Sequence, residues 1–154
     1  MNNIPVIDQI LAVLQDHCKE LAAALQFRQA AEINDIGEAS AVFPALHWQV
    51  DDEIRNTENN TDGEDIRGFT LQFPIHFKIT TAGGRKCQLM PEVRRLVAVL
   101  QEKIEADPTL QNTALWTEYI STRFFLHDGG AVGGAIVTYH ITYRRRRAQP
   151  DISY

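Results

Sequence analysis

The alternation of apolar and polar positions is clearest in the middle of the chain. Residues 69–79 place an apolar side chain at every second position, and the positions between them are more polar. A period of two predicts a strand with one face packed on a core and one face toward solvent. Pro74 lies inside this run, and since proline has no N–H to donate, it predicts an edge position or a bulge.

Two other segments have apolar residues at steps of three and four, which predict amphipathic helices. The first covers about 7–25, with Asp8 at its start as a cap or first-turn residue. We expect this helix to fray within the stretch 26–31. The second covers about 90–106 and has Pro91 near its first turn, where proline is tolerated.

Three further strands complete the predicted fold. The first covers 42–50 and contains Pro44, which favours an edge position or an irregular start. The other two cover about 114–127 and 134–146, joined by a glycine-rich turn. The element order αββαββ predicts an α+β two-layer sandwich: a four-stranded, mainly antiparallel sheet with two helices on one face. We expect the other face of the sheet to be open to solvent or partners.

Length and composition predict one soluble domain over residues 1–154. The chain is 44% hydrophobic and 23% charged, which is ordinary for a globular protein. No apolar run approaches the roughly 20 residues needed to span a bilayer. The first five residues lack the features of a signal peptide. We therefore expect no membrane association, and a cytoplasmic product or one released by lysis.

Charge is unevenly distributed along a chain whose net charge is −5. An acidic segment at about 51–66 has no periodicity and predicts an exposed, mobile loop. The alternating last strand runs directly into four consecutive arginines, Arg144–Arg147, which begin a basic C-terminal tail. Since each buried guanidinium would need its own partner, this strand must deliver its charge to a surface.

The sequence offers no constellation for catalysis, metal binding or a cofactor, so we expect a non-enzyme. His76 and His140 share the more polar face of their strands, and would form a metal or acid–base pair only with a carboxylate beside them. Residues 51–53 resemble a carboxylate cluster but head the predicted loop, which favours solvation over metal binding. The paired glycines and the serines match no phosphate loop or nucleophile elbow.

Nucleic-acid binding is an alternative, because RNA-recognition domains also place two helices under a four-stranded sheet. Their element order is βαββαβ, however, and the aromatic residues of 69–79 belong to the packed face here. Arg144–Arg147 would still suit phosphates, whose neutralisation releases counterions.

The arrangement resembles the tail terminator (tail completion) proteins of long-tailed bacteriophages, over nearly the whole chain. The similarity lies in the first helix with Ile10, Leu11, Leu14 and Leu21, the long acidic segment between the first two strands, the second helix with 92–100, and the last strand with 137–144. It implies a ring, usually of six subunits, that caps the tail tube, stops its polymerisation and presents a docking surface to neck or head-completion proteins.

The resemblance also implies partners and a location. The partners are further copies of the chain, the tail-tube protein, the sheath protein where a tail has one, and the neck or head-completion protein. Genomic DNA would pass through the lumen without sequence-specific binding. The protein would be assembled in the host cytoplasm and lie in the virion, at the neck end of the tail.

A closed ring joins unlike surfaces of neighbouring subunits, and the basic strand end and the acidic segment suit such pairing. We therefore expect subunit or tail-tube contacts at Arg144, Arg145, Arg146, Arg147, Asp51, Asp52, Glu53, Asp62, Glu64 and Asp65. We expect Arg94 and Arg95 to face the lumen or a neighbour. Two alternatives stay open: a neck or head–tail connector component, and, from another class, a ferredoxin-like nucleic-acid-binding protein.

Overall fold

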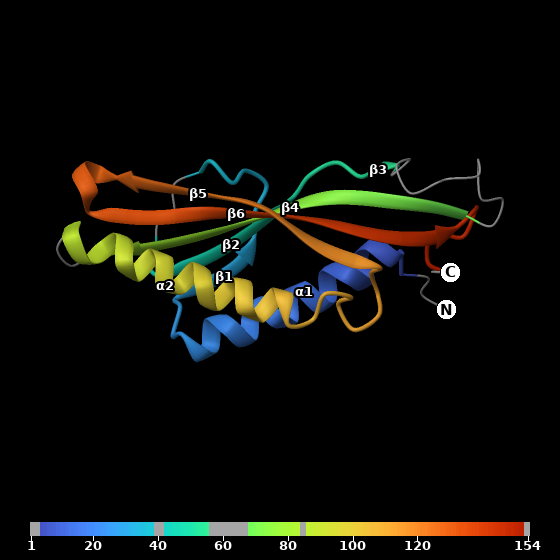
Figure 1. The fold of residues 1–154 in the computed structure, drawn as a ribbon, viewed down its shortest axis with the longest axis horizontal. Helices are drawn as coiled ribbons and strands as arrows, with labels where there is room; N and C mark the ends of the chain where they lie inside the picture. Colours follow the sequence, from blue (N-terminus) through green and yellow to red (C-terminus); the bar gives the residue numbers. More distant parts are fainter. Residues whose placement is uncertain (1–3, 39–41, 56–67, 84–85, 153–154) are drawn as a thin grey trace.

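Two helices lie on one face of a mixed β-sheet in the computed structural model, which describes residues 4–38, 42–55, 68–83 and 86–152 (Figure 1). The helices are α1 (Val6–Ala24) and α2 (Lys86–Glu105). The α+β class and the placement of both helices on one face are confirmed. Neither helix is long and apolar enough to cross a membrane within the part of the chain that is described.

The sheet has six strands rather than the four expected from the sequence. They are β1 (Gln29–Glu32), β2 (Ala45–Val50), β3 (Ile54–Arg55), β4 (Gly68–Ala82), β5 (Trp116–His127) and β6 (Val132–Arg146). Their order is β1-β2-β4-β6-β5, and the short β3 also pairs with β4. Only the β1–β2 pair is parallel among these pairings, so the expectation of a mainly antiparallel sheet is confirmed.

Strand β1 occupies a stretch that we expected to be the frayed end of the first helix. The helix ends at Ala24, and Gln26 adopts a left-handed conformation with φ of 57°. The chain then turns, and Gln29 aligns beside Ala45 of β2. Four residues are too few to show a period of two. Pairing with β2, and not the local sequence pattern, determines that so short a segment forms a strand.

Helix α2 begins earlier than expected from the sequence, so that Pro91 lies inside it.

Pro74 marks a bulge and not an edge. Strand β4 is central, with β2 and β3 on one side and β6 on the other. The neighbouring strand is interrupted opposite Pro74, between β2 and β3, where the Asp51 N–H donates to the Pro74 carbonyl at 3.0 Å. Since the N and O atoms of one strand residue point to the same side, the missing N–H of Pro74 faces this interruption. The other proline, Pro44, precedes β2 and does not lie within it.

The core forms between the helices and one face of the sheet, as the apolar alternation predicts. Phe73, Ile75, Phe77 and Ile79 of β4 are fully buried on this face. The register sets β4 beside β6, and the rings of Phe77 and Tyr139 meet edge to face at 6.1 Å between centroids. The helices contribute Ile10, Leu14, Leu21, Val93, Leu96, Leu100 and Ile104. Each such side chain contributes roughly 1.5–3 kcal/mol by leaving water, so this layer dominates stability.

The opposite face of the sheet is partly covered, contrary to the expectation that it would be open. Lys78 and Thr80 of β4 are only 3% and 2% exposed. The Lys78 ammonium donates to the Glu38 carbonyl at 2.5 Å and lies 5.7 Å from the centre of the Phe125 ring. Burial lowers the pKa of Lys78, although the carboxylates of Asp35 and Glu38 act in the other direction. The chain before β2 therefore closes one end of this face.

The glycines expected in the β5–β6 turn have two separate roles. Gly129, with φ of +65°, lies in the turn itself, where a left-handed conformation favours glycine. Gly134 belongs to β6, and a Cβ there would lie 2.5 Å from the Ile79 carbonyl oxygen. A Cβ at Gly133 would lie 2.9 Å from the Leu89 side chain of α2, so this second pair permits close packing of β6 on its neighbours and does not form the turn.

Candidate functional site

The four arginines extend the sheet at one end of the molecule. Arg144, Arg145 and Arg146 are still part of β6, aligned with Thr70, Phe69 and Gly68 of β4. Arg144, Arg146 and Arg147 are exposed, and Arg145 is half-buried. Both termini lie at this same end (Figure 1). The strand thus delivers its charge to a surface, as expected. Arg144–Arg147 form the end of β6 and the start of a turn, however, and not a basic tail.

Phe69 is the centre of a positively charged cluster at this end. The Arg147 guanidinium carbon lies 4.7 Å from the ring centroid, and that of Arg145 lies 5.0 Å away. Arg55 of β3 reaches the same ring at 5.6 Å. A cation within about 6 Å of an aromatic face is attracted by the ring quadrupole. The half-buried ring therefore gathers three guanidinium groups from two separate segments. We call Arg55, Phe69 and Arg144–Arg147 together the arginine end.

The residues after Arg147 fold back on the start of the chain. The Arg146 N–H donates to the Ile152 carbonyl at 2.7 Å, and the Gln149 N–H donates to Arg146 at 3.2 Å. The Val6 N–H of α1 donates to the Pro150 carbonyl at 2.8 Å. Since the first N–H groups of a helix have no partner inside it, Pro150 satisfies one of them. The arginine end is therefore fixed to α1 by backbone hydrogen bonds.

The first residues of the acidic segment are held against the sheet, contrary to the expectation of a mobile loop from residue 51. An Asp51 carboxylate oxygen lies 2.7 Å from Nε2 of His76. The hydroxyl of Tyr143, in β6, donates to the carboxylate of Glu53. Asp52 is exposed and lines a surface pocket. The other acidic positions expected to make contacts, Asp62, Glu64 and Asp65, lie outside the described residues.

The two described residues that flank 56–67 lie at the arginine end of the sheet. Arg55, the last described residue before the segment 56–67, pairs with Leu71. Gly68, the first residue after it, pairs with Arg146. We expected the acidic and basic groups to form two separate surfaces for neighbouring subunits. Arg55 and Gly68 therefore lie together at this end, and the contacts expected of the acidic residues stay a prediction.

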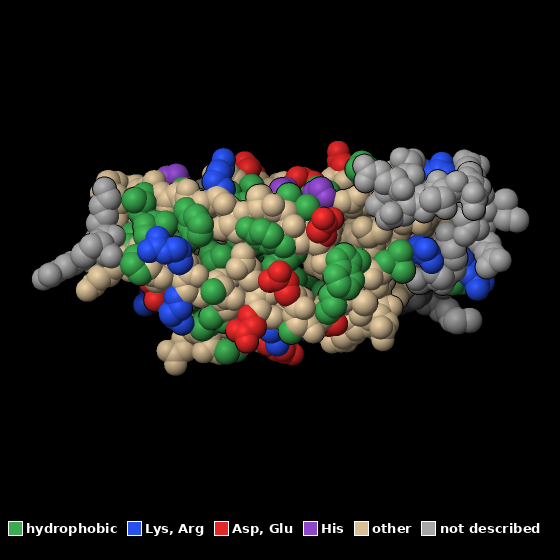
Figure 2. Space-filling view, viewed as in Figure 1, with side chains coloured by type: hydrophobic (Ala, Val, Ile, Leu, Met, Phe, Trp, Pro, Cys, Tyr) green, Lys and Arg blue, Asp and Glu red, His purple; other side chains and the backbone are tan. Residues whose placement is uncertain are grey.

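Strand β5 is an exposed apolar edge that sequence reasoning missed. It lies at the end of the strand order, and five of its large apolar side chains are at least 38% exposed: Trp116, Tyr119, Ile120, Phe124 and Leu126. Figure 2, seen from the side on which β5 passes in front, shows hydrophobic side chains in a broken row across the molecule. The signal was present in the sequence, because 115–126 has apolar residues at both odd and even positions. A strand with one face toward solvent would have apolar residues at every second position only.

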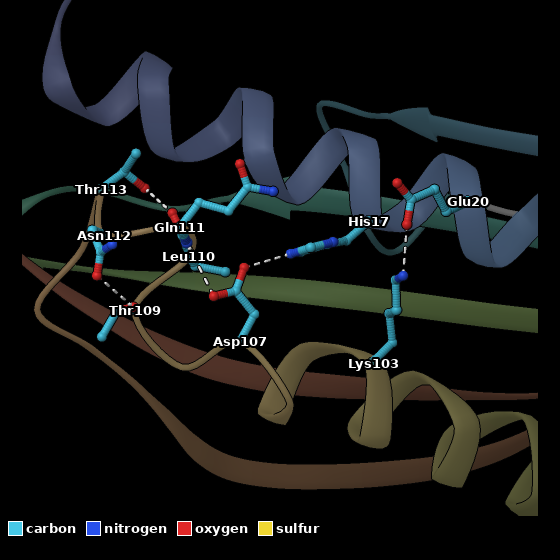
Figure 3. A network of polar contacts seen from close by, with 9 residues as sticks. All are labelled: His17, Glu20, Lys103, Asp107, Thr109, Leu110, Gln111, Asn112 and Thr113. Atoms are coloured by element: carbon cyan, nitrogen blue, oxygen red, sulfur yellow. Dashed lines mark hydrogen bonds and ion pairs between the residues drawn. The ribbon is translucent and has the colours of Figure 1, made fainter.

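The helix layer supplies an acidic surface away from the arginine end. Two pairs join the helices: His17 with Asp107 at 2.8 Å, and Glu20 with Lys103 at 2.6 Å (Figure 3). The two helices expose five acidic side chains: Asp8 in the first turn of α1, and Asp16, Glu20, Glu102 and Glu105. Figure 2 shows acidic side chains beneath the hydrophobic row. Within the described residues, this layer therefore forms an acidic surface apart from the arginines.

Arg94 and Arg95 also lie on the helix layer, on α2. Both are exposed, and Arg95 makes two hydrogen bonds to the Glu92 carboxylate one turn earlier, at 2.6 and 2.9 Å. The bond to Glu92 raises the pKa of Arg95 and keeps it charged. Since α2 begins near the β5–β6 turn, these arginines are remote from the arginine end (Figure 1).

The two strand histidines have separate polar partners. His76 bridges Asp51 and the Thr138 hydroxyl, at 2.7 and 2.8 Å. His140 is bonded through Nδ1 to the Gln72 side chain at 2.6 Å and borders a surface pocket of about 310 Å³. A carboxylate does therefore join His76, but no group of three or more His, Cys, Asp or Glu residues within the described ranges is placed to hold a metal ion.

Comparison with known proteins gives no family for this chain. No protein-family profile matches it, and no curated protein sequence does. Among solved structures, a chain of the virion of a native gene transfer agent (GTA) particle is similar over 94% of this chain and 95% of that chain, with 9% identity and a TM-score of 0.42.

Proposed function

We propose that the chain is a structural protein of a bacteriophage virion: a tail terminator. It forms a ring of six subunits that caps the tail tube, stops tube polymerisation and offers a docking surface to neck or head-completion proteins. The proposal rests on the resemblance in sequence texture over nearly the whole chain. It also rests on the one structural observation that the subunit has two unlike charged surfaces, in different places.

Those two surfaces are what a ring requires. In a closed ring of identical subunits, each contact joins one surface of a subunit to a different surface of the next. The arginine end gathers Arg55, Arg145 and Arg147 around Phe69, while the helix layer presents Asp16, Glu20, Glu102 and Glu105. Opposite potentials of this kind steer association and fix its orientation. We assign the ring contact to these two surfaces.

The proposed role needs binding alone and no covalent chemistry. Its partners are other copies of the chain, the tail-tube protein and the neck protein, with the sheath protein in a contractile tail and genomic DNA in the lumen. Arg94 and Arg95 on α2 are candidates for the lumen or for a neighbour. The place of action is the neck end of the tail.

The proposed function is tested by an assay of tail-tube capping. A tail-tube protein encoded in the same genome is polymerised with and without this chain, and tube length and tube ends are measured by electron microscopy. We expect shorter tubes with a ring at one end. The double variant Arg144→Ser/Arg146→Ser changes exposed arginines that are not stacked on Phe69, and it should weaken capping.

The matched control is Arg28→Ser, which removes an exposed arginine that precedes β1. It should cap as well as the wild type. Tubes of unchanged length without rings at any ratio of the two proteins would refute the terminator. Rings that bind the neck or portal protein but ignore tubes would favour the head–tail connector alternative.

The arginine end also supports a second candidate, the binding of a nucleic acid. A cluster of guanidinium groups around an aromatic ring matches the way proteins hold single strands, by phosphate contacts and stacking. The test is fluorescence anisotropy with an oligonucleotide at rising salt. Steep salt-dependent binding by a protein that forms no ring would favour this candidate over the terminator.

A further inference from the structure

The long side of β5 that faces away from β6 has no strand beside it among the described residues. This edge is twelve residues long and carries large exposed apolar side chains, including Trp116 at 57% and Phe124 at 43% exposed. An open edge presents unpaired N–H and C=O groups, and an apolar edge of this length is a template for another strand. Exposed apolar surface of this kind indicates a binding partner.

The register with β6 assigns the side chains of β5 to its two faces. Thr117 and Tyr119 pair with Ile141 and Tyr139, whose side chains are buried beneath the helices. Trp116 and Glu118 therefore lie on the opposite face. A bulge at Ile120 adds one residue, so beyond it the parity changes. The faces are then as follows: Trp116, Glu118, Ser121, Arg123 and Phe125 on the face away from the helices, and Thr117, Tyr119, Thr122, Phe124 and Leu126 on the helix side.

We infer that β5 pairs with β5 of a second copy of this chain, antiparallel and about a twofold axis. In the register we assign, Glu118 faces the partner's Arg123, and Arg123 faces the partner's Glu118. The same register brings Trp116 against the partner's Phe125 on the same face. On the helix side it brings Thr117 against the partner's Phe124. Two sheets thus become one continuous sheet across the dimer.

Charge complementarity selects both the partner and the register. Glu118 and Arg123 are the only Asp, Glu, Lys or Arg residues in β5. Within the described part of the chain, neither has an ion-pair partner. Shifting the partner by two residues in either direction keeps the faces matched but sets Glu118 opposite an uncharged residue. Only the assigned register neutralises both charges in both copies, because a twofold axis repeats each pair.

The alternative edge for pairing is β1, and it fits less well. It has four residues, Gln29–Glu32, against the twelve of β5. Its only charged residue is Glu32, which would pair with Arg123 and leave Glu118 unmatched. A second β5 matches the length, the apolar side chains and the two charges together.

This inference goes beyond the proposed ring and does not depend on it. A twofold contact closes on itself, so it cannot propagate around a ring. The β5 pair therefore describes the protein away from the tail, where it covers the apolar edge, and the ring uses the arginine end and the helix layer.

Charge reversal tests the pairing in the full-length chain. The molar mass of the wild type is measured by sedimentation equilibrium over a range of concentrations, without any phage protein, and is expected to show a dimer. Glu118→Arg sets like charges opposite each other at two places, and so does Arg123→Glu. Each should raise the dimer dissociation constant by at least about tenfold. The double variant Glu118→Arg/Arg123→Glu restores both pairs and should dimerise like the wild type.

Matched reversals outside β5, Glu32→Arg and Lys19→Glu, change the net charge equally at exposed positions and should leave the dimer unchanged. Far-ultraviolet circular dichroism verifies that each variant is folded. A wild type that stays monomeric at the highest concentration would overturn the inference, as would a dimer that both single reversals leave intact. A double variant that stays as weak as the single ones would overturn the assigned register. None of these outcomes bears on tube capping, which the ring surfaces control.

Discussion

His17 on α1 is bonded to Asp107, in the turn that follows α2, with 2.8 Å between Nε2 and a carboxylate oxygen. Since a carboxylate only accepts, Nε2 of His17 carries the proton. The other oxygen of Asp107 accepts from the Gln111 N–H at 3.0 Å. One carboxylate thus joins the two helices and orders the turn leading to β5.

Removal of either partner should lower the free energy of unfolding by about 1–3 kcal/mol, because the bond is charge-assisted and partly buried. The variants His17→Ala, Asp107→Ala and the double variant form a cycle that is measured by urea denaturation. We expect a coupling energy of about 1–2 kcal/mol. The exposed pair Glu20 and Lys103 is the control cycle, and it should give well under 1 kcal/mol. Equal coupling in both cycles would contradict the special role of the His17–Asp107 bond.

Alkaline pH should unfold the protein through Tyr139 and Tyr143. Burial raises the pKa of both phenols well above the ordinary range, and nearby Glu105 and Glu53 raise it further. In the unfolded chain these phenols ionise near pH 10, so the unfolded state is favoured as the pH rises past about 10. The stability that these two phenols contribute is fully present below about pH 10. It is lost progressively as the pH rises toward their pKa in the folded protein.

The measurement is a titration followed at once by tyrosinate absorbance and by circular dichroism. We expect part of the tyrosinate signal to arise only as the fold is lost. The variant Tyr143→Phe has one such phenol fewer. It should lose less stability over about pH 9–11, the range around the ordinary phenol pKa of about 10. Complete ionisation of all tyrosines with the fold intact would be the contrary result.

The ring of Phe69 should stabilise the arginine end. Replacement by Leu keeps an apolar side chain but removes the π-face that Arg145 and Arg147 approach. We expect Phe69→Leu to cost about 1–2 kcal/mol in the free energy of unfolding. Phe69→Tyr retains an aromatic face and serves as the control, with a smaller loss. If Leu and Tyr were equivalent at this position, the cation–π contribution would be negligible.

Much of the fold follows from periodicity, because the long elements carry it. The strand at 69–79 and both helices were predicted, since each buries one regular stripe of side chains. Strand β1 was missed because its four residues show no pattern, and pairing with β2 determines them. The burial of Lys78 was also missed, since its cover comes from a segment before β2 that no local rule connects to it.

The surfaces were predicted less well than the core. The sequence correctly indicated that Arg144–Arg147 reach a surface, because their charge density excludes burial. It could not show that Phe69 lies beside Arg145, which depends on the β4–β6 register. Nor could it show that Arg55 and Gly68, on either side of 56–67, lie beside these arginines. The edge position of β5 is a property of the strand order, and sequence alone does not determine that order.

Native mass spectrometry distinguishes a ring-forming tail terminator from a protein that forms no ring. The pure chain is measured alone over a range of concentrations, and again after mixing with the tail-tube protein from the same genome. We expect a closed ring of six copies once the tube protein is present. A protein that stays a monomer or dimer at every concentration, with the tube protein present as well as without it, would contradict the terminator.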